Sequence, residues 1–470
     1  MEFDKLETIV EKKDKTTIND QEISYSFLFE KGTFKDTTEI TSFAYLGTKG
    51  KHRPVIFVTN GGPGSGVVWQ HLALFGPDRI RIPDIMHPPV TPPYELETNP
   101  FCLLDIADIV LIDPPGTGYS KLNEETKKEY ESVDGDAVAV GLYLQHWITA
   151  HKRINSPLYF MGESYGTVRA PAVLEALYGG AVLGNKHLAG FSLSGVILLG
   201  TAFSTGSFAD RMSQVNKPAL NLLTCAATYA LHTGKDPYQA AEDAWAFAPE
   251  YAKLLFEGRN ADAAAVKKAA KRISFWTGLP AEQLIKDHLK FTMDDFMKKA
   301  IPGQIIGFYD GRYLMNDHIQ EADYDVLADD SGMGMFTPAF TAGAYLLAEK
   351  YGLPNVPYDM LNCVVNTEWD RKSAHTSLSA LKTPRGAMKT SGSCLRPVST
   401  ISAPLPAMSA IPFPSPRWIR IVWNSMNIRE VIWPISVMIP RHCWWKISGS
   451  LSVTERGAIH WTHVLFPHLY

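Results

Sequence analysis

The first 200 residues alternate between short apolar runs of strand length and longer segments with helical spacing. Within the short runs, apolar residues either alternate with polar ones or follow each other directly, as they do in buried strands. The predicted strands are residues 23–29, 38–46, 53–60, 108–113, 156–162 and 193–203, and the predicted helices are residues 134–151 and 164–178.

This order of elements predicts an α/β fold with a mostly parallel central sheet. Continuously apolar strands are typical of sheets whose two faces are both covered by helices. Such sheets bind ligands beyond the carboxyl ends of their strands. Two predicted strands end there in glycine-rich loops, and Ser164 follows a third strand at the same edge.

Changes of pattern further along the chain predict four segments. Residues 1–203 form the first part of the α/β core. Residues 204–335 contain alanine-rich stretches with helical spacing and no apparent strands, which indicates a helical insertion over the core. The core resumes at residues 336–370, where a further helix is expected at 338–352.

The last hundred residues differ from the rest in composition. Residues 371–470 contain 12 Lys and Arg, 2 Glu and no Asp, so their net charge is +10 against −14 for residues 1–370. Residues 402–418 are rich in proline and follow neither a helical nor a strand period. We interpret this segment as an atypical tail, which a reading-frame change near residue 372 would explain.

Charge and hydropathy favour neither nucleic acid nor a membrane as a partner. The 470 residues have a net charge of −4, and the basic residues of the tail share no helical or strand face. No apolar run approaches the roughly 20 residues that span a bilayer. The N-terminus mixes charges of both signs and lacks the apolar stretch of a signal peptide, so a cytoplasmic protein is expected.

Ser164 is the candidate nucleophile. It lies in a Gly-x-Ser-x-Gly pattern with Gly162 and Gly166, after a predicted strand and before a predicted helix. Flanking glycines allow the tight turn that exposes such a serine, and the helix N-terminus offers free N–H groups and a positive dipole end. The alternative is a serine with a purely structural role.

The glycine-rich loop at residues 60–66, Asn-Gly-Gly-Pro-Gly-Ser-Gly, is a candidate oxyanion hole. Glycines let backbone N–H groups approach the oxyanion of a tetrahedral intermediate closely. A phosphate-binding loop would end in Gly-Lys-Ser/Thr and lead directly into a helix, and this loop does neither. A plain turn is the remaining alternative.

Together, the motifs at residues 60–66, 113–120 and 162–171 resemble the serine carboxypeptidase family, peptidase family S10, within the α/β-hydrolase fold. The resemblance covers roughly residues 20–370. It implies a serine-type carboxypeptidase that hydrolyses C-terminal peptide bonds, a peptide substrate with a free C-terminus, no metal or cofactor, and a helical cap in the insertion. Members of the family are often secreted or reside in other compartments.

Individual positions match the family's functional residues. Ser164 matches the nucleophile that carries the acyl group, and the backbone amides of Gly62 and Tyr165 match the oxyanion hole. The groups that hold the C-terminal carboxylate of the substrate match Asn60, Gly61 and Glu163.

Two positions depart from the family's pattern. Many members have Cys-Ser where this chain has Ser65 and Gly66, so the family's disulfide cannot form here. Members often have a glutamate, at the position of Leu74, that shares a proton with the residue matching Glu163, because two neighbouring carboxylates do not both ionise cheaply. We hypothesise that Glu163 consequently ionises more readily here and repels a substrate carboxylate.

The sequence offers no convincing triad partners for Ser164. The triad aspartate and histidine of this fold follow the serine on loops after later strands. No aspartate follows Asp370, and no later histidine is preceded by glycine, so His460 and His463 are only the nearest substitutes.

Three functions therefore stay open. The first is a serine carboxypeptidase with an acyl-enzyme on Ser164. The second is a catalytically impaired or inactive homologue, since removing the histidine of a triad costs about 10⁶ in kcat. The third is an esterase or acyltransferase of the same fold, because an acyl-enzyme can also pass its acyl group to an alcohol. No feature of the sequence indicates an oligomeric state.

Overall fold

The computed structural model describes residues 1–370 except 49, 51, 179–188, 201, 203–207 and 318–329, together with two short strands near the C-terminus. The strands are β1 (Phe3–Ile18), β2 (Gln21–Phe34), β3 (Glu39–Gly47), β4 (Val55–Thr59), β5 (Asp78–Ile80), β6 (Leu96–Thr98), β7 (Asp108–Asp113), β8 (Leu158–Glu163), β9 (Gly195–Leu199), β10 (Gln304–Ile306), β11 (Leu314–Asn316), β12 (Leu451–Val453) and β13 (Ile459–Trp461). The helices are α1 (Val68–Gln70), η1 (His71–Phe75), η2 (Lys127–Glu129), α2 (Val133–Ala150), α3 (Gly166–Tyr178), α4 (Phe208–His232), α5 (Pro237–Glu257), η4 (Gly258–Asn260), α6 (Ala263–Thr277), α7 (Ala281–Lys286), α8 (Met293–Lys299), α9 (Ser331–Tyr351) and α10 (Cys363–Glu368).

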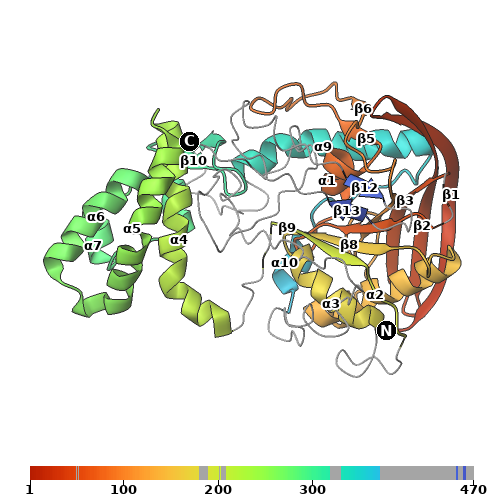
Figure 1. Ribbon diagram of the computed structural model, residues 1–470, viewed down its shortest axis with the longest axis horizontal. Coiled ribbons are helices and arrows are strands. Elements are labelled where there is room, and N and C mark those ends of the chain that lie inside the picture. Colours follow the sequence, from red (N-terminus) through yellow and green to blue (C-terminus); the bar gives the residue numbers. More distant parts are fainter. Residues whose placement is uncertain are drawn as a thin grey trace.

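The central sheet has seven strands in the order β1-β2-β3-β7-β4-β8-β9 (Figure 1). The strands β7, β4, β8 and β9 are parallel, whereas β1, β2 and β3 are antiparallel to their neighbours. The predicted α/β fold is confirmed, but the sheet is mixed rather than mostly parallel. The parallel half carries the strand ends that the sequence singled out.

Helices cover both faces of the sheet, and each face has its own hydrophobic cluster. On one face α2 and α3 pack against the sheet, where the ring of Trp147 meets Phe57 edge to face at 5.3 Å. On the other face α1, η1 and α9 pack, with Trp69 against Phe340 at 4.8 Å. Each such buried ring contributes roughly 1.5–3 kcal/mol by its removal from water, so this core fixes the sheet edge on which the site is built.

The strand β1 lies outside the predicted elements. It pairs with β2 along nearly its whole length and forms one edge of the sheet. Most of its side chains are exposed or half-buried, and they include charges of both signs. Because this strand is held by its pairing with β2 and buries few side chains, its sequence lacks the apolar run that reveals the central strands.

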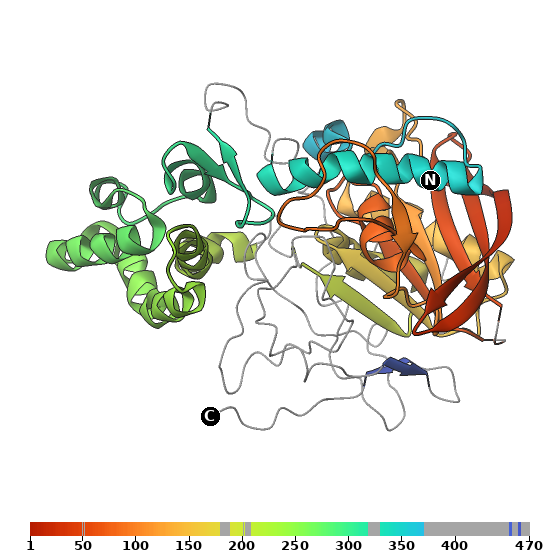
Figure 2. The same cartoon turned by 90° about the horizontal axis from the view of Figure 1, so that it is seen from above.

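The helices α4–α8 lie together at one side of the sheet in both views (Figures 1 and 2). The helices α4, α5, α6 and α7 share a hydrophobic cluster of their own, which includes Phe247, Tyr251 and Trp276. The sequence predicted helices and no strands for residues 204–335. The second part of that prediction is wrong, because β10 and β11 form a hairpin. Each has three residues, too few to show a strand pattern. Among the described helices, none combines the length and apolar character needed to cross a membrane.

Candidate active site

Ser164 lies on a tight turn between the end of β8 and the start of α3. Its backbone has φ 52°, which a residue other than glycine adopts rarely and at a cost in strain. The N–H of Ser164 donates to the carbonyl of Leu199 on β9 at 2.9 Å, and its carbonyl accepts from the hydroxyl of Thr167 at 2.6 Å. These contacts hold the half-buried serine at the carboxyl edge of the sheet.

Close packing surrounds both glycines of the motif and is tightest at Gly162. A Cβ atom on Gly162 would lie 2.0 Å from the carbonyl oxygen of Gly166. A Cβ atom on Gly166 would lie 3.1 Å from the carbonyl oxygen of Asn60. The strand end and the first turn of α3 therefore pack too closely for a side chain at position 162, whereas a side chain at position 166 requires the carbonyl of Asn60 to shift by a few tenths of an ångström.

The loop after β4 lies directly against the Ser164 turn. The strands β4 and β8 are parallel neighbours in which Thr59 pairs with Gly162, so the residues that follow each strand meet at one edge. A Cβ atom on Gly61 would lie 2.7 Å from the Cβ of Ser164 and 2.9 Å from the backbone nitrogen of Tyr165. The two strand ends thereby bring together all six predicted site residues, which are Asn60, Gly61, Gly62, Glu163, Ser164 and Tyr165.

The side chain of Asn60 is buried and held on both sides. Its Nδ2 donates to Oγ of Ser65 at 2.7 Å, and its Oδ1 accepts from Nε2 of Gln70 at 3.4 Å. The serine that replaces the family's cysteine therefore has a contact of its own in this loop.

Glu163 is buried beside the glycine loop, and burial raises the pKa of its carboxyl group to about 8. The N–H of Gly61 donates a hydrogen bond that opposes this rise but does not cancel it. Burial therefore keeps the carboxyl group of Glu163 neutral near pH 7, so the predicted repulsion of a substrate carboxylate does not arise there, whereas the predicted difference from a protein with glutamate at position 74 stays a prediction. Removal from water disfavours the carboxylate even without a second acid beside it.

The sequence analysis missed a buried ion pair between Arg169 and Asp136. Nε of Arg169 in α3 lies 2.6 Å from Oδ2 of Asp136 in α2, and both side chains are almost fully buried. Nη1 of Arg169 donates to the carbonyl of Asn60 at 2.7 Å, and the guanidinium lies over the ring of Tyr165 at 5.1 Å. An arginine between the apolar residues Val168 and Ala170 of a predicted helix was the available signal.

Asp113, at the end of β7, organises the second glycine-rich loop. Its carboxylate accepts from the hydroxyl of Tyr358 at 2.6 Å and from the N–H of Val67 at 2.8 Å. Burial raises its pKa to about 6, against the effect of these hydrogen bonds. Gly118 has φ +58°, and a Cβ there would lie 2.0 Å from Oδ2 of Asp113, so this motif needs its glycine as well.

The segment before and within α10 holds the first glycine-rich loop from its other side. The N–H of Asn362 donates to the carbonyl of Gly64 at 2.7 Å, and Nδ2 of Asn366 donates to the carbonyl of Pro63 at 2.8 Å. Residues about 300 positions apart in the sequence thus fix one loop.

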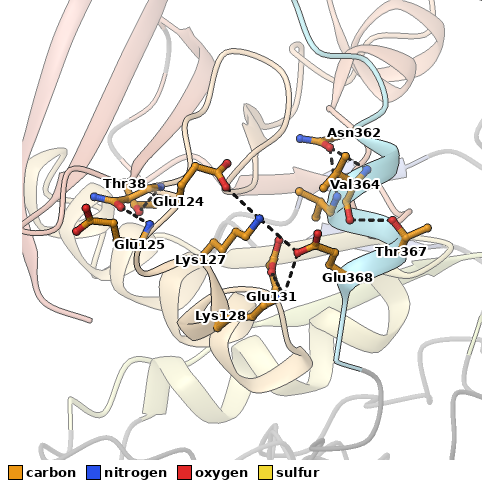
Figure 3. A network of polar contacts seen from close by, with 12 residues as sticks. Thr38, Glu124, Glu125, Lys127, Lys128, Glu131, Asn362, Val364, Thr367 and Glu368 are labelled. Atoms are coloured by element: carbon orange, nitrogen blue, oxygen red, sulfur yellow. Dashed lines mark hydrogen bonds and ion pairs between the residues drawn. The ribbon is translucent and has the colours of Figure 1, made fainter.

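The helix α10 is in turn attached to the core at the surface (Figure 3). Glu368 accepts from Lys127 at 3.3 Å and from Lys128 at 3.0 Å. Just beyond the helix, the ring of Trp369 meets the ring of Tyr165 edge to face at 5.3 Å. The last described part of the core therefore contacts both the loop and the Ser164 turn.

No histidine within the described residues forms a hydrogen bond with Ser164. His71, for example, is fully buried against Tyr45, with 2.7 Å between Nε2 and the hydroxyl, and burial lowers its pKa to about 3. It therefore serves the core rather than proton transfer.

The described residues do not test the two histidines that were named as substitutes for the triad histidine. The N–H of Asp370 donates to the carbonyl of Glu131 at 2.8 Å, next to the start of α2. Only the backbone of His460 is described, in β13, and His463 lies outside the described residues. The same is true of nearly all of the predicted atypical tail at residues 371–470.

The sheet order and the serine turn between β8 and α3 define a protein of the α/β-hydrolase class. Residues 43–210 match the family model described as serine carboxypeptidase. This match confirms the resemblance to the serine carboxypeptidases over that part of the chain, which contains all six predicted site residues. No curated protein matches the chain in a sequence comparison.

Similar solved structures include Kex1, a prohormone-processing carboxypeptidase from Saccharomyces cerevisiae, at 14% identity and a TM-score of 0.38. That similarity covers 73% of this chain, and the chain spans 64% of the length of Kex1. The peroxisomal α/β-hydrolase Lpx1 from the same organism is similar at 15% identity and a TM-score of 0.22. That similarity covers 47% of this chain and 52% of the length of Lpx1. These scores are low, so the fold assignment rests on this chain's own sheet and turn.

Proposed function

We propose that this protein is a serine-type carboxypeptidase in which Ser164 attacks the last peptide carbonyl of a substrate with a free C-terminus. The observation that carries the proposal is the contact between the loop at Gly61 and the Ser164 turn, at a strained φ of 52°. A nucleophile and two candidate oxyanion donors thereby share one edge of the sheet. The family match over residues 43–210 supports the same chemistry.

In the proposed reaction, Oγ of Ser164 forms a bond to the carbonyl carbon while its proton leaves to a base. The carbonyl oxygen becomes an oxyanion that the N–H groups of Gly62 and Tyr165 stabilise. The intermediate then collapses to an acyl-enzyme, and the C–N bond breaks as the released amino acid takes up a proton. Water hydrolyses the ester in the reverse sense of the first step.

Asn60, Gly61 and Glu163 are proposed to hold the substrate's terminal carboxylate. With a pKa of about 8, the carboxyl group of Glu163 is neutral at pH 7 and has a proton to donate in a hydrogen bond. The side-chain amide of Asn60 lies in the loop after β4 that also contains Gly61. An ionised Glu163 would instead repel the substrate, so binding of free C-termini should weaken as the pH rises through about 8.

The test combines an active-site probe with matched substrates. A fluorophosphonate should label the wild-type protein and not Ser164→Ala. Peptides with free C-termini should be cleaved and their C-terminal amides should not. Preference for amides or simple esters would instead indicate the esterase or acyltransferase alternative.

A catalytically impaired homologue is the second candidate, because no described histidine forms a hydrogen bond with Ser164 and no aspartate follows Asp370. In that case the probe would label Ser164 slowly or not at all. The comparison variant is a chain whose residues after 370 are replaced by those that the other reading frames encode. If the replaced chain is active and the unaltered chain is not, the defect lies in the tail. If both chains hydrolyse the substrate at the same measurable rate, the unaltered chain is not impaired.

A further inference from the structure

Arg169 is a buried charged residue in the first turn of α3, and the proposed chemistry does not use it directly. We propose that Arg169 is a positioning residue that holds the two halves of the candidate oxyanion hole at a fixed separation. The two halves are the loop at residues 60–62 and the Ser164 turn. This inference rests on the proposed function, because an oxyanion hole matters only if Ser164 forms an acyl-enzyme.

One side chain contacts both halves. Nη1 of Arg169 donates to the carbonyl of Asn60 at 2.7 Å, in the residue before the two loop glycines. Its guanidinium lies 5.1 Å from the ring centre of Tyr165, whose N–H is the second candidate donor. Asp136 holds the far side of the guanidinium at 2.6 Å and accepts from the hydroxyl of Tyr165 at 3.4 Å.

The backbone alone does not fix this separation. The pairing between β4 and β8 ends at Thr59 and Gly162, so the loop residues lie beyond the last strand pair. A guanidinium is planar, with donors at fixed angles, and it cannot shift toward one partner without losing the other. Beside the hydrogen bond from the N–H of Gly61 to Glu163, Arg169 therefore supplies a second connection beyond the last strand pair, and this one reaches Tyr165 as well.

Stability is a poor explanation for this ion pair. The side chains of Arg169 and Asp136 are 1% and 2% exposed, so both charges have lost their hydration. Replacing such a buried pair by apolar residues of similar size is often neutral or stabilising, whereas removing one partner is strongly destabilising. Removing both charges together should thus separate positioning from folding.

The experiment compares the wild-type protein with the double variant Arg169→Met/Asp136→Leu and with Arg169→Lys. Arg53→Met is the matched control, because Arg53 pairs with Asp108 at 2.8 Å at the start of β7, so this ion pair lies at the amino ends of the parallel strands and not at the carboxyl ends where the site is. Turnover of a p-nitrophenyl ester gives kcat and KM, and the fluorophosphonate gives the labelling rate of Ser164. Amide hydrogen exchange over residues 60–66 and 164–170 reports the loop and the turn without requiring catalysis.

In the double variant, kcat and the labelling rate should fall about 100-fold, as expected for a displacement of about 1 Å in a catalytic group. KM and the thermal unfolding midpoint should change little, and exchange should accelerate in both segments. Arg169→Lys keeps a cation but reaches fewer partners, so its kcat should be intermediate. Arg53→Met should lower the unfolding midpoint without lowering kcat.

A folded double variant with wild-type kcat and wild-type exchange in both segments would overturn the positioning role. A wild-type protein that neither labels nor turns over would reject the proposed function but not the contact itself. In that case exchange decides: acceleration in both segments of the double variant supports the positioning role, and unchanged exchange rejects it.

Discussion

Replacing Glu163 by glutamine should make the stability of the protein less dependent on pH. Burial raises the pKa of this carboxyl group from its ordinary 4.5 to about 8 in the folded protein. Between these two values the folded state keeps a proton that the unfolded state releases. The free energy of unfolding of the wild-type protein should therefore fall as the pH rises, until the folded group also ionises near pH 8.

The magnitude follows from the two pKa values. They differ by about 3.5, and each pH unit corresponds to about 1.4 kcal/mol, so at most about 5 kcal/mol is lost between pH 4.5 and 8. Below the ordinary pKa the carboxyl group is protonated in both states, and its contribution is constant. Glutamine cannot ionise, so the Glu163→Gln variant should lack this part of the pH dependence.

Urea denaturation of both proteins at a series of pH values measures the effect. The difference in unfolding free energy, variant minus wild type, should rise by up to about 1.4 kcal/mol per pH unit over the window and level off above pH 8. Glu368→Gln is the control, because that carboxyl group is exposed and its pKa is lowered by Lys128 and Lys127. A flat difference for Glu163→Gln between pH 5 and 8 would show that Glu163 ionises normally and refute the burial argument.

Three further predictions concern the packing around the site. Gly162→Ala should destabilise the protein by about 1–3 kcal/mol or more and prevent labelling of Ser164 by the fluorophosphonate, because the new Cβ would lie 2.0 Å from the carbonyl oxygen of Gly166. A variant that is as stable as the wild type in thermal denaturation and is still labelled would contradict this prediction. Tyr358→Phe removes the 2.6 Å hydrogen bond to Asp113, so the pKa of Asp113, about 6 in the wild-type protein, should rise. The free energy of unfolding, measured by urea denaturation, should therefore fall by about 1–3 kcal/mol above pH 6, where Asp113 is ionised, and by less below pH 6. Glu368→Gln breaks exposed contacts with two lysines and should barely move the thermal midpoint, with or without salt; a large drop would mean that α10 depends on them.

The central strands of the fold were predictable because strands that are buried on both faces have continuous apolar runs in their sequence. The predicted strands at 53–60 and 108–113 correspond to β4 and β7. The edge strand β1 was not predicted from the sequence, because most of its side chains are exposed to solvent and only its pairing with β2 makes it a strand. The hairpin of β10 and β11 escaped because each strand is too short to show a period.

The sequence by itself determined the candidate nucleophile and the loop beside it. Ser164 and the glycines at 61 and 62 follow strands that are neighbours, and a tight turn needs small residues at fixed positions, so local pattern sufficed. The sequence after Asp370 likewise contains neither an aspartate nor a glycine-histidine pair, which are the residues expected for the triad.

Only the tertiary structure decided the electrostatics of the site. The pKa of Glu163 depends on how completely the fold removes it from water, which neighbours in the sequence do not reveal, so the expected charge on Glu163 near neutral pH could not be judged from Leu74. The contacts of Arg169 likewise join α3, α2 and the loop after β4, three segments far apart in the chain. Spacing along a sequence identifies groups that can react, whereas their charge and position depend on burial and on contacts that only the folded chain creates.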